Sequence, residues 1–373
     1  MTILPDDIQA VQIQEDRTPA VVTLPFASQE KVQKLPPDEV LIRVRAVGLA
    51  PTDWKHAFTE WGTPGAISGC DAAGNVLAVG SAVTHVKVGD RVGAFNYGGS
   101  WQKDNGAFAE YARFIAATCI VLPPDMTYEE GASLPGAHFT AVQVLYMRLG
   151  LPKPLTSEAA AFKKKDEKIL IWGASTSVGH HAIQLAALSG LEVYATASLS
   201  AHEEVKALGA SHVFDYRDQD AARKIQKAAG EEGIVYAIDC VCEKGSTDVI
   251  IDAMSSVRGG KVITLLFVPE PTQNRRADVK VEFTLAYTIL GYDIEFAHFL
   301  KVSAKPEDKA YLLEYCGRDI SRVLEGWKAG EGAPTFKPQR LREIGGGIEG
   351  IARGLKVMQE GKYGREKLVC KIA

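Results

Sequence analysis

The middle of the chain alternates short apolar runs with amphipathic helical patterns. Residues 168–175 and 191–198 are apolar runs of strand length, and residues 178–190 carry apolar residues at helical spacing up to Gly190. Helix and strand patterns then continue in turn, in residues 201–210, 211–216, 220–230, 234–241, 246–260 and 261–267. This alternation predicts right-handed crossovers and a doubly wound α/β fold with a parallel sheet.

The first third of the chain follows the two-residue period of half-buried strands. Along residues 40–47, one set of alternate positions is wholly apolar and the other carries two arginines. Residues 74–83 and 89–95 repeat this style, with Gly, Asp and Ser between the runs. The pattern predicts a mostly-β region ahead of the parallel sheet.

Further segments precede and follow the predicted parallel sheet in the sequence. Residues 151–168 are polar and rich in Pro and Lys, which predicts an exposed loop or linker ahead of it. Behind it, helical patterns return at 310–330 and 346–362, and residues 366–372 predict a last strand. The glycines of 345–350 follow no parallel strand and are interpreted as the turn into a helix.

The connection between the first strand and helix of the predicted sheet has the composition of a phosphate-binding turn. Gly173 and Gly179 bracket it, and small residues let the backbone approach a pyrophosphate at the helix N-terminus. Three hydroxyl residues stand where such turns usually carry a central glycine, and their hydroxyls can donate to phosphate oxygens. A plain strand-to-helix turn is the alternative. The predicted cofactor contacts here are Gly173, Ser175, Thr176, Ser177 and Val178.

The end of the next strand indicates which dinucleotide binds. A binder of NAD usually places Asp or Glu there for the ribose diol, whereas this chain has Ser198, with His202 just beyond. A neutral donor tolerates a 2′-phosphate that a carboxylate would repel, so NADPH is predicted; the alternative for Ser198 is a helix N-cap. Tyr216 is predicted to stack on the adenine. Val241 and Leu266, near the ends of two later strands, complete the predicted cofactor contacts.

Composition and charge limit the classes of function that the chain can have. The 373 residues carry a net charge of −4 and 46% hydrophobic residues, which gives no electrostatic case for nucleic acid or an anionic membrane. The six cysteines are scattered without a CxxC pair, and no apolar run approaches the ~20 residues of a membrane-spanning helix. The acidic first residues are unlike a signal peptide, so a cytoplasmic location is expected.

Six segments of the chain carry a family resemblance. They are residues 48–56, 67–92, 106–111, 134–141, 214–218 and 354–372, which together span nearly the whole chain. The chain resembles the zinc-free quinone oxidoreductase and enoyl reductase branch of the medium-chain dehydrogenase/reductase superfamily, and PTDWKH followed by GCDAAG is most similar to fungal trans-acting enoyl reductases of the lovastatin type. The resemblance implies a Rossmann cofactor domain at 161–296 and a GroES-like, mostly-β catalytic domain made from 1–160 and 297–373.

The resemblance also bears on zinc. Zinc-dependent relatives carry a Cys-Gly-Thr-Asp motif, then Gly-His-Glu, then a lobe with four cysteines. Here Ala50 stands at the position of the first cysteine, Cys70 at that of the histidine, and no cysteine cluster follows Arg91. A catalytic zinc needs three protein ligands, and Cys70 with Asp71 supplies two at most unless His138 joins them. No metal site is predicted, and Cys70 is interpreted as a small buried residue.

Without zinc, the resemblance implies hydride addition to an activated double bond, in which negative charge develops on the carbonyl oxygen as an enolate. Similar enoyl reductases place a Lys and a Thr at the positions of Lys55 and Thr140. Lys55 would stabilise the enolate or lend a proton, and Thr140 would bind the nicotinamide ribose or the substrate oxygen. His138 departs from the family pattern and is an alternative proton donor. Surface or structural roles stay open for all three, and solvent can also supply the proton.

Three functions remain open on the sequence alone. The first is NADPH-dependent reduction of an enoyl thioester or enone, in its narrow form by a trans-acting enoyl reductase on chains carried by a fungal polyketide synthase. The second is a stand-alone quinone or enone oxidoreductase acting on small molecules. The third is an NADPH-binding protein without efficient catalysis. Monomer and homodimer both stay open, because the family that the chain resembles contains both.

Overall fold

Two compact units make up the computed structural model, which describes residues 4–26, 32, 34–163, 165–296, 298–327 and 336–372. The first unit comprises 1–136, 287–327 and 338–373, so both ends of the chain contribute to it. The second comprises 137–286 and 328–337. The division of the chain into domains after residues 160 and 296 stays a prediction.

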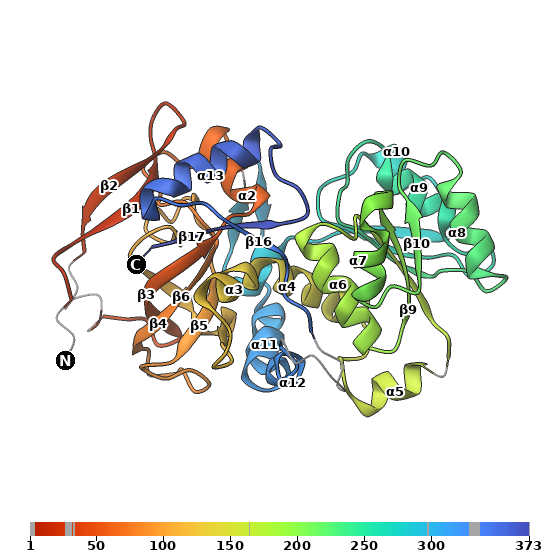
Figure 1. The fold of residues 1–373 in the computed structure, drawn as a ribbon, viewed down its shortest axis with the longest axis horizontal. Helices are drawn as coiled ribbons and strands as arrows, with labels where there is room; N and C mark the ends of the chain where they lie inside the picture. The colour runs from red at the N-terminus through yellow and green to blue at the C-terminus, as the bar shows by residue number, and fades with distance from the viewer. Residues whose placement is uncertain are drawn as a thin grey trace. The chain divides into compact units, whose positions relative to one another are not determined.

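The first unit is built on a seven-stranded, mostly antiparallel sheet. Its order is β16-β17-β3-β4-β5-β7, and β6 also pairs with β3. The C-terminal strand β17, blue in Figure 1, lies antiparallel beside the N-terminal β3, with Val369 opposite Gly48. The elements of this unit are β1 (Asp7–Ile13), β2 (Pro19–Pro25), β3 (Glu39–Gly48), α2 (Pro51–Phe58), β4 (Asp71–Val79), β5 (Arg91–Phe95), β6 (Tyr111–Ile115), β7 (Cys119–Val121), α3 (Tyr128–Ser133), β14 (Ile294–Phe296), β15 (Leu300–Val302), α11 (Pro306–Glu314), α12 (Ile320–Leu324), β16 (Leu341–Glu343), α13 (Gly350–Gln359) and β17 (Lys367–Lys371).

The core of the first unit joins apolar residues from both ends of the chain. Val40 and Ile42 of β3 are fully buried, as the alternating pattern predicts. Ile351 and Leu355, one helical turn apart on α13, and Leu368 of β17 belong to the same cluster. Burying each such side chain is worth about 1.5–3 kcal/mol, so the C-terminal segment contributes directly to the stability of the N-terminal sheet.

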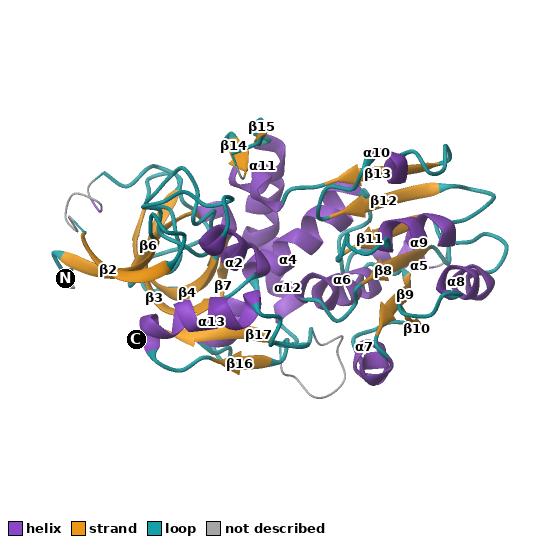
Figure 2. Cartoon of the chain, turned by 90° about the horizontal axis from the view of Figure 1, so that it is seen from above, coloured by secondary structure: helices purple, strands orange, loops and turns teal. Residues whose placement is uncertain are grey.

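The second unit contains the predicted parallel sheet, seen in Figure 2 with its helices around it. Its six strands run in the order β10-β9-β8-β11-β12-β13, and every neighbouring pair is parallel. The doubly wound α/β fold is therefore confirmed. The elements are β8 (Lys168–Trp172), α6 (Ser177–Leu188), β9 (Glu192–Ala197), α7 (His202–Ala207), β10 (His212–Asp215), α8 (Ala221–Ala229), β11 (Tyr236–Asp239), α9 (Ser246–Ala253), β12 (Gly260–Thr264), α10 (Glu270–Gln273) and β13 (Val279–Phe283), with α5 (Ser157–Lys163) ahead of them and α4 (Pro135–Val142) leading in from the first unit.

Some segments differ from the sequence-based expectation. The segment 151–168, which was predicted as a loop, contains the helix α5. Residue 164 of this segment lies outside the described residues. Strand β13 was not predicted, because its charged residues Lys280 and Glu282 break the apolar run. The predicted helix at 310–330 begins earlier, at Pro306, and continues into α12 through a π-helical segment at Tyr315–Asp319. Residues 328–330 lie outside the described part.

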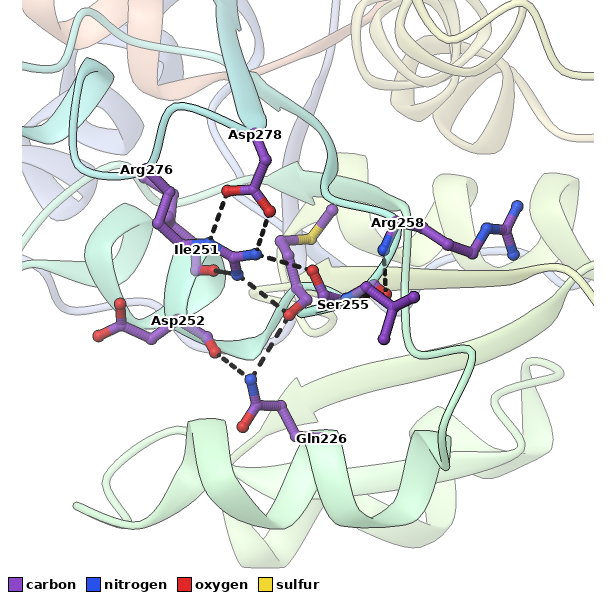
Figure 3. Close-up of polar contacts among 9 residues, drawn as sticks. Gln226, Ile251, Asp252, Ser255, Arg258, Arg276 and Asp278 are labelled. Carbon is purple, nitrogen blue, oxygen red and sulfur yellow. Dashed lines mark hydrogen bonds and ion pairs between the residues drawn. The ribbon is translucent and has the colours of Figure 1, made fainter.

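The C-terminal end of α9 is fixed by one arginine at the edge of the parallel sheet (Figure 3). The guanidinium of Arg276 donates to the carbonyl oxygens of Ile251 at 3.0 Å, Met254 at 3.2 Å and Ser255 at 2.7 Å. Its Nη2 and Nε also donate to the carboxylate of Asp278, at 2.6 and 3.1 Å. The last carbonyls of a helix lack part of their helical hydrogen bonding, and Arg276 adds a charged donor to these three.

Candidate functional site

The turn predicted to bind phosphate joins β8 to α6. Gly173 has a φ of +82°, and a Cβ at this position would lie 2.6 Å from Cγ2 of Val241, so a larger residue meets both strain and a clash. At Gly179, an added Cβ would lie 2.4 Å from the carbonyl oxygen of Gly173. The two glycines therefore let the N-terminus of α6 pack directly against the turn, as dinucleotide-binding turns require.

The three hydroxyl residues of the turn have different surroundings. Thr176 is the N-cap of α6, and its Oγ1 accepts a hydrogen bond from the amide of Gly179 at 3.0 Å. Ser177 is the first residue of the helix. The Oγ of Ser175 is buried, and no described group hydrogen-bonds to it. A buried hydroxyl without a protein partner at the start of a twelve-residue helix fits a phosphate oxygen as its missing partner.

The remaining predicted cofactor residues follow the carboxyl ends of neighbouring strands. The register pairs Asp215 of β10 with Ala197 of β9, so the residues that come next along the two strands are neighbours. Ligands of open α/β sheets bind at this edge where the strand order reverses, which here is between β8 and β11. The residues at this edge are Ser198, Tyr216, Val241 and Leu266.

Ser198 directly precedes a short 3₁₀-helical turn at Leu199–Ala201, but its side chain does not cap this turn. Its Oγ makes no capping hydrogen bond and lies 3.3 Å from the Oγ of Ser200. His202 begins α7, and its Nε2 lies 3.3 Å from the carbonyl oxygen of Ala197. The end of β9 therefore presents hydroxyl groups and an imidazole rather than a carboxylate.

The end of β10 presents an aromatic ring and a cation. Tyr216 is 47% exposed, which leaves its ring accessible to a planar ligand. Arg217 lies 5.6 Å from the centroid of this ring and binds Asp215 through two hydrogen bonds of 2.9 and 2.7 Å. These bonds lower the pKa of Asp215 to about 2.

Asp239 shapes the loop after β11, and the sequence analysis did not single it out. Its fully buried carboxylate accepts from the amides of Val241 at 2.9 Å and Cys242 at 2.8 Å, and from the hydroxyls of Ser246 at 2.6 Å and Thr247 at 2.7 Å. Four donors compensate the charge without a cation. The loop is thereby fixed with Val241 against Gly173 of the turn that is predicted to bind phosphate.

His138 and Thr140 lie on α4. The ring of His138 is fully buried, edge-on to His181 of α6 with centroids 5.4 Å apart and to Phe336 at 5.5 Å. Burial lowers the pKa of His138 to about 3, so its imidazole is neutral near pH 7. These properties favour the structural role over proton donation. Thr140 is half-buried on the same helix.

Lys55 lies on α2 in the first unit, close to two indole rings. Its Nζ is 5.2 Å from the ring centroid of Trp61 and 5.8 Å from that of Trp54. No carboxylate of the described residues forms an ion pair with it. Lys55 is half-buried, so its ammonium group is available to an anion and partly shielded from water.

Two buried carboxyl groups belong to the same unit as Lys55. Asp71 pairs with Nζ of Lys367 at 2.8 Å and accepts from the amide of Gly136 at 2.7 Å. Asp53 accepts from the amide of Ala50 at 2.7 Å. Burial, together with the negative charge of Asp71, raises the pKa of Asp53 to about 7.

Comparison with known proteins identifies the family. The model of the alcohol dehydrogenase GroES-like domain matches residues 36–124, and that of zinc-binding dehydrogenases matches 177–296. The trans-enoyl reductase ACTTS2 of Alternaria alternata is 35% identical over 89% of this chain and 91% of its own. The chain belongs to the trans-enoyl reductases of the medium-chain dehydrogenase/reductase superfamily. The enoyl reductase component lovC of the lovastatin nonaketide synthase of Aspergillus terreus is 33% identical over 91% of this chain and 90% of its own.

Solved structures show the same superfamily fold. A putative zinc-dependent alcohol dehydrogenase from Rhizobium etli matches with a TM-score of 0.75 at 23% identity, over 99% of both chains. The CurK enoyl reductase matches with a TM-score of 0.68 at 19% identity, over 99% of this chain and 100% of its own. The predicted combination of a GroES-like and a Rossmann-type fold is thereby confirmed.

Membership in this superfamily makes the chain an oxidoreductase with a nicotinamide dinucleotide as its cofactor. The residues of the turn fit such a group, because the buried Oγ of Ser175 lacks a protein partner and the space beside Gly173 and Gly179 admits no side chain. No helix of the described residues combines the length and the apolar character that crossing a membrane requires.

The first unit does not fit the zinc that one of the family descriptions names. Within the described residues, no group of three or more His, Cys, Asp or Glu side chains is placed to hold a metal ion. The oxygens of Asp71 are bonded to Lys367 and Gly136, and Ala50 has no donor atom. Burial also raises the pKa of the Cys70 thiol well above its usual value, which disfavours the thiolate that zinc binds.

Proposed function

We propose that the chain is an NADPH-dependent enoyl reductase that acts in trans on acyl chains carried by a polyketide synthase. The similarity to named trans-enoyl reductases carries the proposal, because it extends over about nine tenths of both chains. One of these relatives is named as the enoyl reductase component of the lovastatin nonaketide synthase. The substrate class is an α,β-unsaturated thioester.

NADPH is proposed over NADH because of the groups at the end of β9. Ser198 presents a hydroxyl where NAD-binding turns usually present a carboxylate. Arg217, on the next strand end, is the cation that would face a 2′-phosphate, with Tyr216 beside it for the adenine. The Oγ of Ser175 and the N-terminus of α6 would hold the pyrophosphate.

Lys55 is proposed to stabilise the enolate. When bound, the nicotinamide cofactor supplies a hydride to the β-carbon, and negative charge then develops on the thioester oxygen. The ammonium of Lys55 has no carboxylate partner among the described residues, so its charge is not already compensated. The indole rings keep it partly desolvated, which strengthens its attraction to an oxyanion. Thr140 is proposed to bind the nicotinamide ribose or the substrate oxygen.

A substrate panel with purified protein tests the proposal. NADPH oxidation is followed with enoyl thioesters of a pantetheine analogue, with the same chains on an acyl carrier protein, and with quinones. Oxidation by the thioesters, fastest on the carrier, is the expected result. Turnover of quinones alone would replace the proposal with a quinone oxidoreductase. Tight NADPH binding without oxidation in any mixture would leave a binding protein.

The variant Lys55→Ala tests the role of the cation. We expect kcat to fall by about 10²-fold, the order that loss of one donor to a developing oxyanion produces, with the Kd for NADPH within about twofold of wild type. Lys356→Ala is the matched control, because Lys356 also lies over an aromatic ring, 5.6 Å from the centroid of Phe58, but is exposed on α13. Equal kcat for Lys55→Ala and the control would remove Lys55 from the mechanism.

A further inference from the structure

A row of aromatic rings leads from Lys55 to the surface of the first unit. Nζ of Lys55 lies 5.2 Å from the ring centroid of Trp61, and this centroid lies 5.2 Å from that of Phe296. The ring of Phe296 is in turn 6.4 Å from that of Phe299. Trp61 is half-buried, Phe296 is 8% exposed and Phe299 is 66% exposed. These three rings, here called the aromatic row, begin beside the proposed enolate site and end at the solvent.

Two segments that are far apart in the sequence supply the aromatic row. Trp61 follows α2, whereas Phe296 is the last residue of β14 and Phe299 lies in the turn before β15. Figure 2 shows β14 and β15 as a short hairpin at the edge of the first unit. The amide of Phe299 donates to the carbonyl oxygen of Phe296 at 3.3 Å, which closes the turn. Nε2 of His298, in the same turn, donates to the carbonyl oxygen of Gly62 at 3.3 Å and so joins the hairpin to the loop of Trp61.

The inner part of the row is packed, whereas its outer end is not covered. Phe296 lies edge-on to His56 at 5.8 Å and is 6.4 Å from the ring of Tyr97. These contacts fix the ring against which Trp61 and Phe299 both pack. One exposed aromatic side chain on a protein surface is common, but Phe299 extends an ordered row of rings. The row therefore offers a ligand a continuous apolar surface that is already in place.

The chemistry of the row fits the acyl chain of a thioester substrate. Apart from the indole N–H of Trp61, its rings offer apolar contact and no hydrogen-bonding group. The pantetheine arm of a carried substrate has amides and a hydroxyl, which would lose their hydrogen bonds to water against such a surface. An aliphatic acyl chain has no such groups beyond its carbonyl, and Lys55 is proposed to bind that carbonyl. The chain, and not the arm, is therefore stabilised by lying on the row.

We propose that the aromatic row is an acyl-chain subsite through which the enzyme selects long, apolar enoyl thioesters. This inference rests on the proposed enoyl reductase function. With the thioester oxygen at Lys55, the first carbons beyond the double bond lie on Trp61, and carbons further along the chain reach Phe299. Because the row is open at Phe299, chains longer than the row meet no obstruction there. Phe299 touches no reacting atom and acts on chain binding alone.

Phe299→Ala tests the outer end of the row. The ratio kcat/KM is measured with the crotonyl, hexenoyl, octenoyl and decenoyl thioesters of pantetheine. In the wild type we expect kcat/KM to rise with chain length. In Phe299→Ala we expect about a tenfold loss with the decenoyl thioester, the order that one partly buried aromatic contact gives, and a change within about twofold with the crotonyl thioester, which is too short to reach the ring.

Two further variants separate the apolar contact from a general effect on the fold. Phe299→Leu keeps an apolar side chain and should retain most of the wild-type preference for long chains. Trp101→Ala is the matched control, because Trp101 is an aromatic side chain of the same unit that is 46% exposed and lies outside the row. It should leave kcat/KM unchanged with every thioester. Identical chain-length profiles in wild type and Phe299→Ala, or the same change in Trp101→Ala, would overturn the subsite.

Binding of saturated thioesters, which the enzyme cannot reduce, tests the row without turnover. Calorimetric titration should show that wild type binds decanoyl-pantetheine more tightly than butyryl-pantetheine and that Phe299→Ala loses about tenfold in affinity for the decanoyl compound alone. Equal affinities for the two compounds in wild type would overturn the subsite, whatever the activity. Failure of the proposed function looks different: wild-type enzyme would oxidise NADPH with no enoyl thioester, while the difference in binding would persist.

Contact of Phe299 with a carrier protein would give another result. Phe299→Ala would then lose activity with carrier-bound thioesters of every chain length to the same extent, and would keep the wild-type profile with pantetheine thioesters. That outcome would overturn the acyl-chain subsite and assign Phe299 to a protein contact.

Discussion

Asp53 and Asp71 are both buried in the first unit, but different groups compensate their charges. Asp71 has the ammonium of Lys367 at 2.8 Å, and both side chains are almost inaccessible. Asp53 has one backbone amide and faces the charge of Asp71. Removing an ion from water costs several kcal/mol, which a well-placed cation repays and a single amide does not. The same residue type thus serves as a fixed ion in one place and as a titrating acid in the other.

The pH dependence of stability should reveal the proton on Asp53. Its pKa is 3.8 in a model peptide and about 7 in the folded state, so the folded state binds more protons between these values. The free energy of unfolding therefore falls as pH rises from about 4 to 7, by at most about 1.4 kcal/mol per pH unit from this group. Urea unfolding of wild type and Asp53→Asn across this range measures the difference. Parallel curves would show that Asp53 does not titrate there.

Ser198→Asp tests the cofactor preference at the end of β9. A carboxylate beside a 2′-phosphate adds like-charge repulsion, so we expect the Kd for NADPH to rise at least about tenfold while that for NADH stays the same or falls. Fluorescence titration with each cofactor measures both. Ser211→Asp adds the same charge at the start of β10, the opposite edge of the sheet, and should leave both constants unchanged. Unchanged NADPH affinity in Ser198→Asp would contradict the NADPH assignment.

At the scale of elements, periodicity predicted most of the parallel sheet because strands such as β8 and β9 are buried on both faces. Residues 169–172 of β8 are all buried, and such a run is visible in the sequence. Strand β13 has only Val279 fully buried, so its sequence carries no comparable signal. Helix α5 was missed because a Pro- and Lys-rich segment resembles a loop, although Ala159 packs inward. Local pattern therefore identifies elements buried on two sides better than those that touch the core at one residue.

Arg276→Ala tests how one side chain holds the end of α9. Its three carbonyl contacts and its ion pair with Asp278 are lost together, and hydrogen bonds to a charged donor are worth about 1.5–3 kcal/mol. We expect the free energy of unfolding to fall by roughly 2–3 kcal/mol. Arg275→Ala is the control, because its pair with Asp252 is exposed and contributes about 0–1 kcal/mol. Similar losses in the two variants would contradict the capping role.

At the scale of the whole molecule, the two ends of the chain meet in one sheet and at one ion pair. Strand β17 lies between β16 and β3, and its first residue, Lys367, pairs with Asp71 across 296 positions of sequence. Ile351 and Leu368 enter the same core as Val40. The first unit is therefore complete only when the last strand has been made.

Lys367→Met tests the long-range ion pair. Removing one partner of a buried pair leaves the carboxylate of Asp71 uncompensated, which costs about 3–5 kcal/mol of unfolding free energy. We expect the double variant Asp71→Asn/Lys367→Met to recover a large part of this loss, because it leaves no buried charge. Chemical denaturation of the three proteins measures the coupling. A double variant as unstable as Lys367→Met would show that the packing of Lys367, and not its charge, accounts for the loss of stability.

The sequence by itself determined most of the parallel sheet, the turn bracketed by Gly173 and Gly179, and the edge on which the predicted cofactor residues lie. These features are local. A strand, a glycine with positive φ and the first turn of a helix lie within about ten residues of one another, and parallel strands have their carboxyl ends at the same edge of the sheet. It also determined the resemblance from which Lys55, Thr140 and the missing zinc ligands followed, and the family comparison confirms that resemblance.

Only the tertiary structure decided which distant groups meet. Tyr287 reaches Thr52 across 235 positions, and Lys367 reaches Asp71 across 296. Asp239 accepts from two amides of the loop that follows it and from two hydroxyls at the start of α9. No pattern in the sequence separates these residues from others of their type, because burial and a specific partner give them their chemistry. The pKa of Asp53 is the clearest case: the residue is visible in PTDW, but its proton depends on the closed interior and on Asp71.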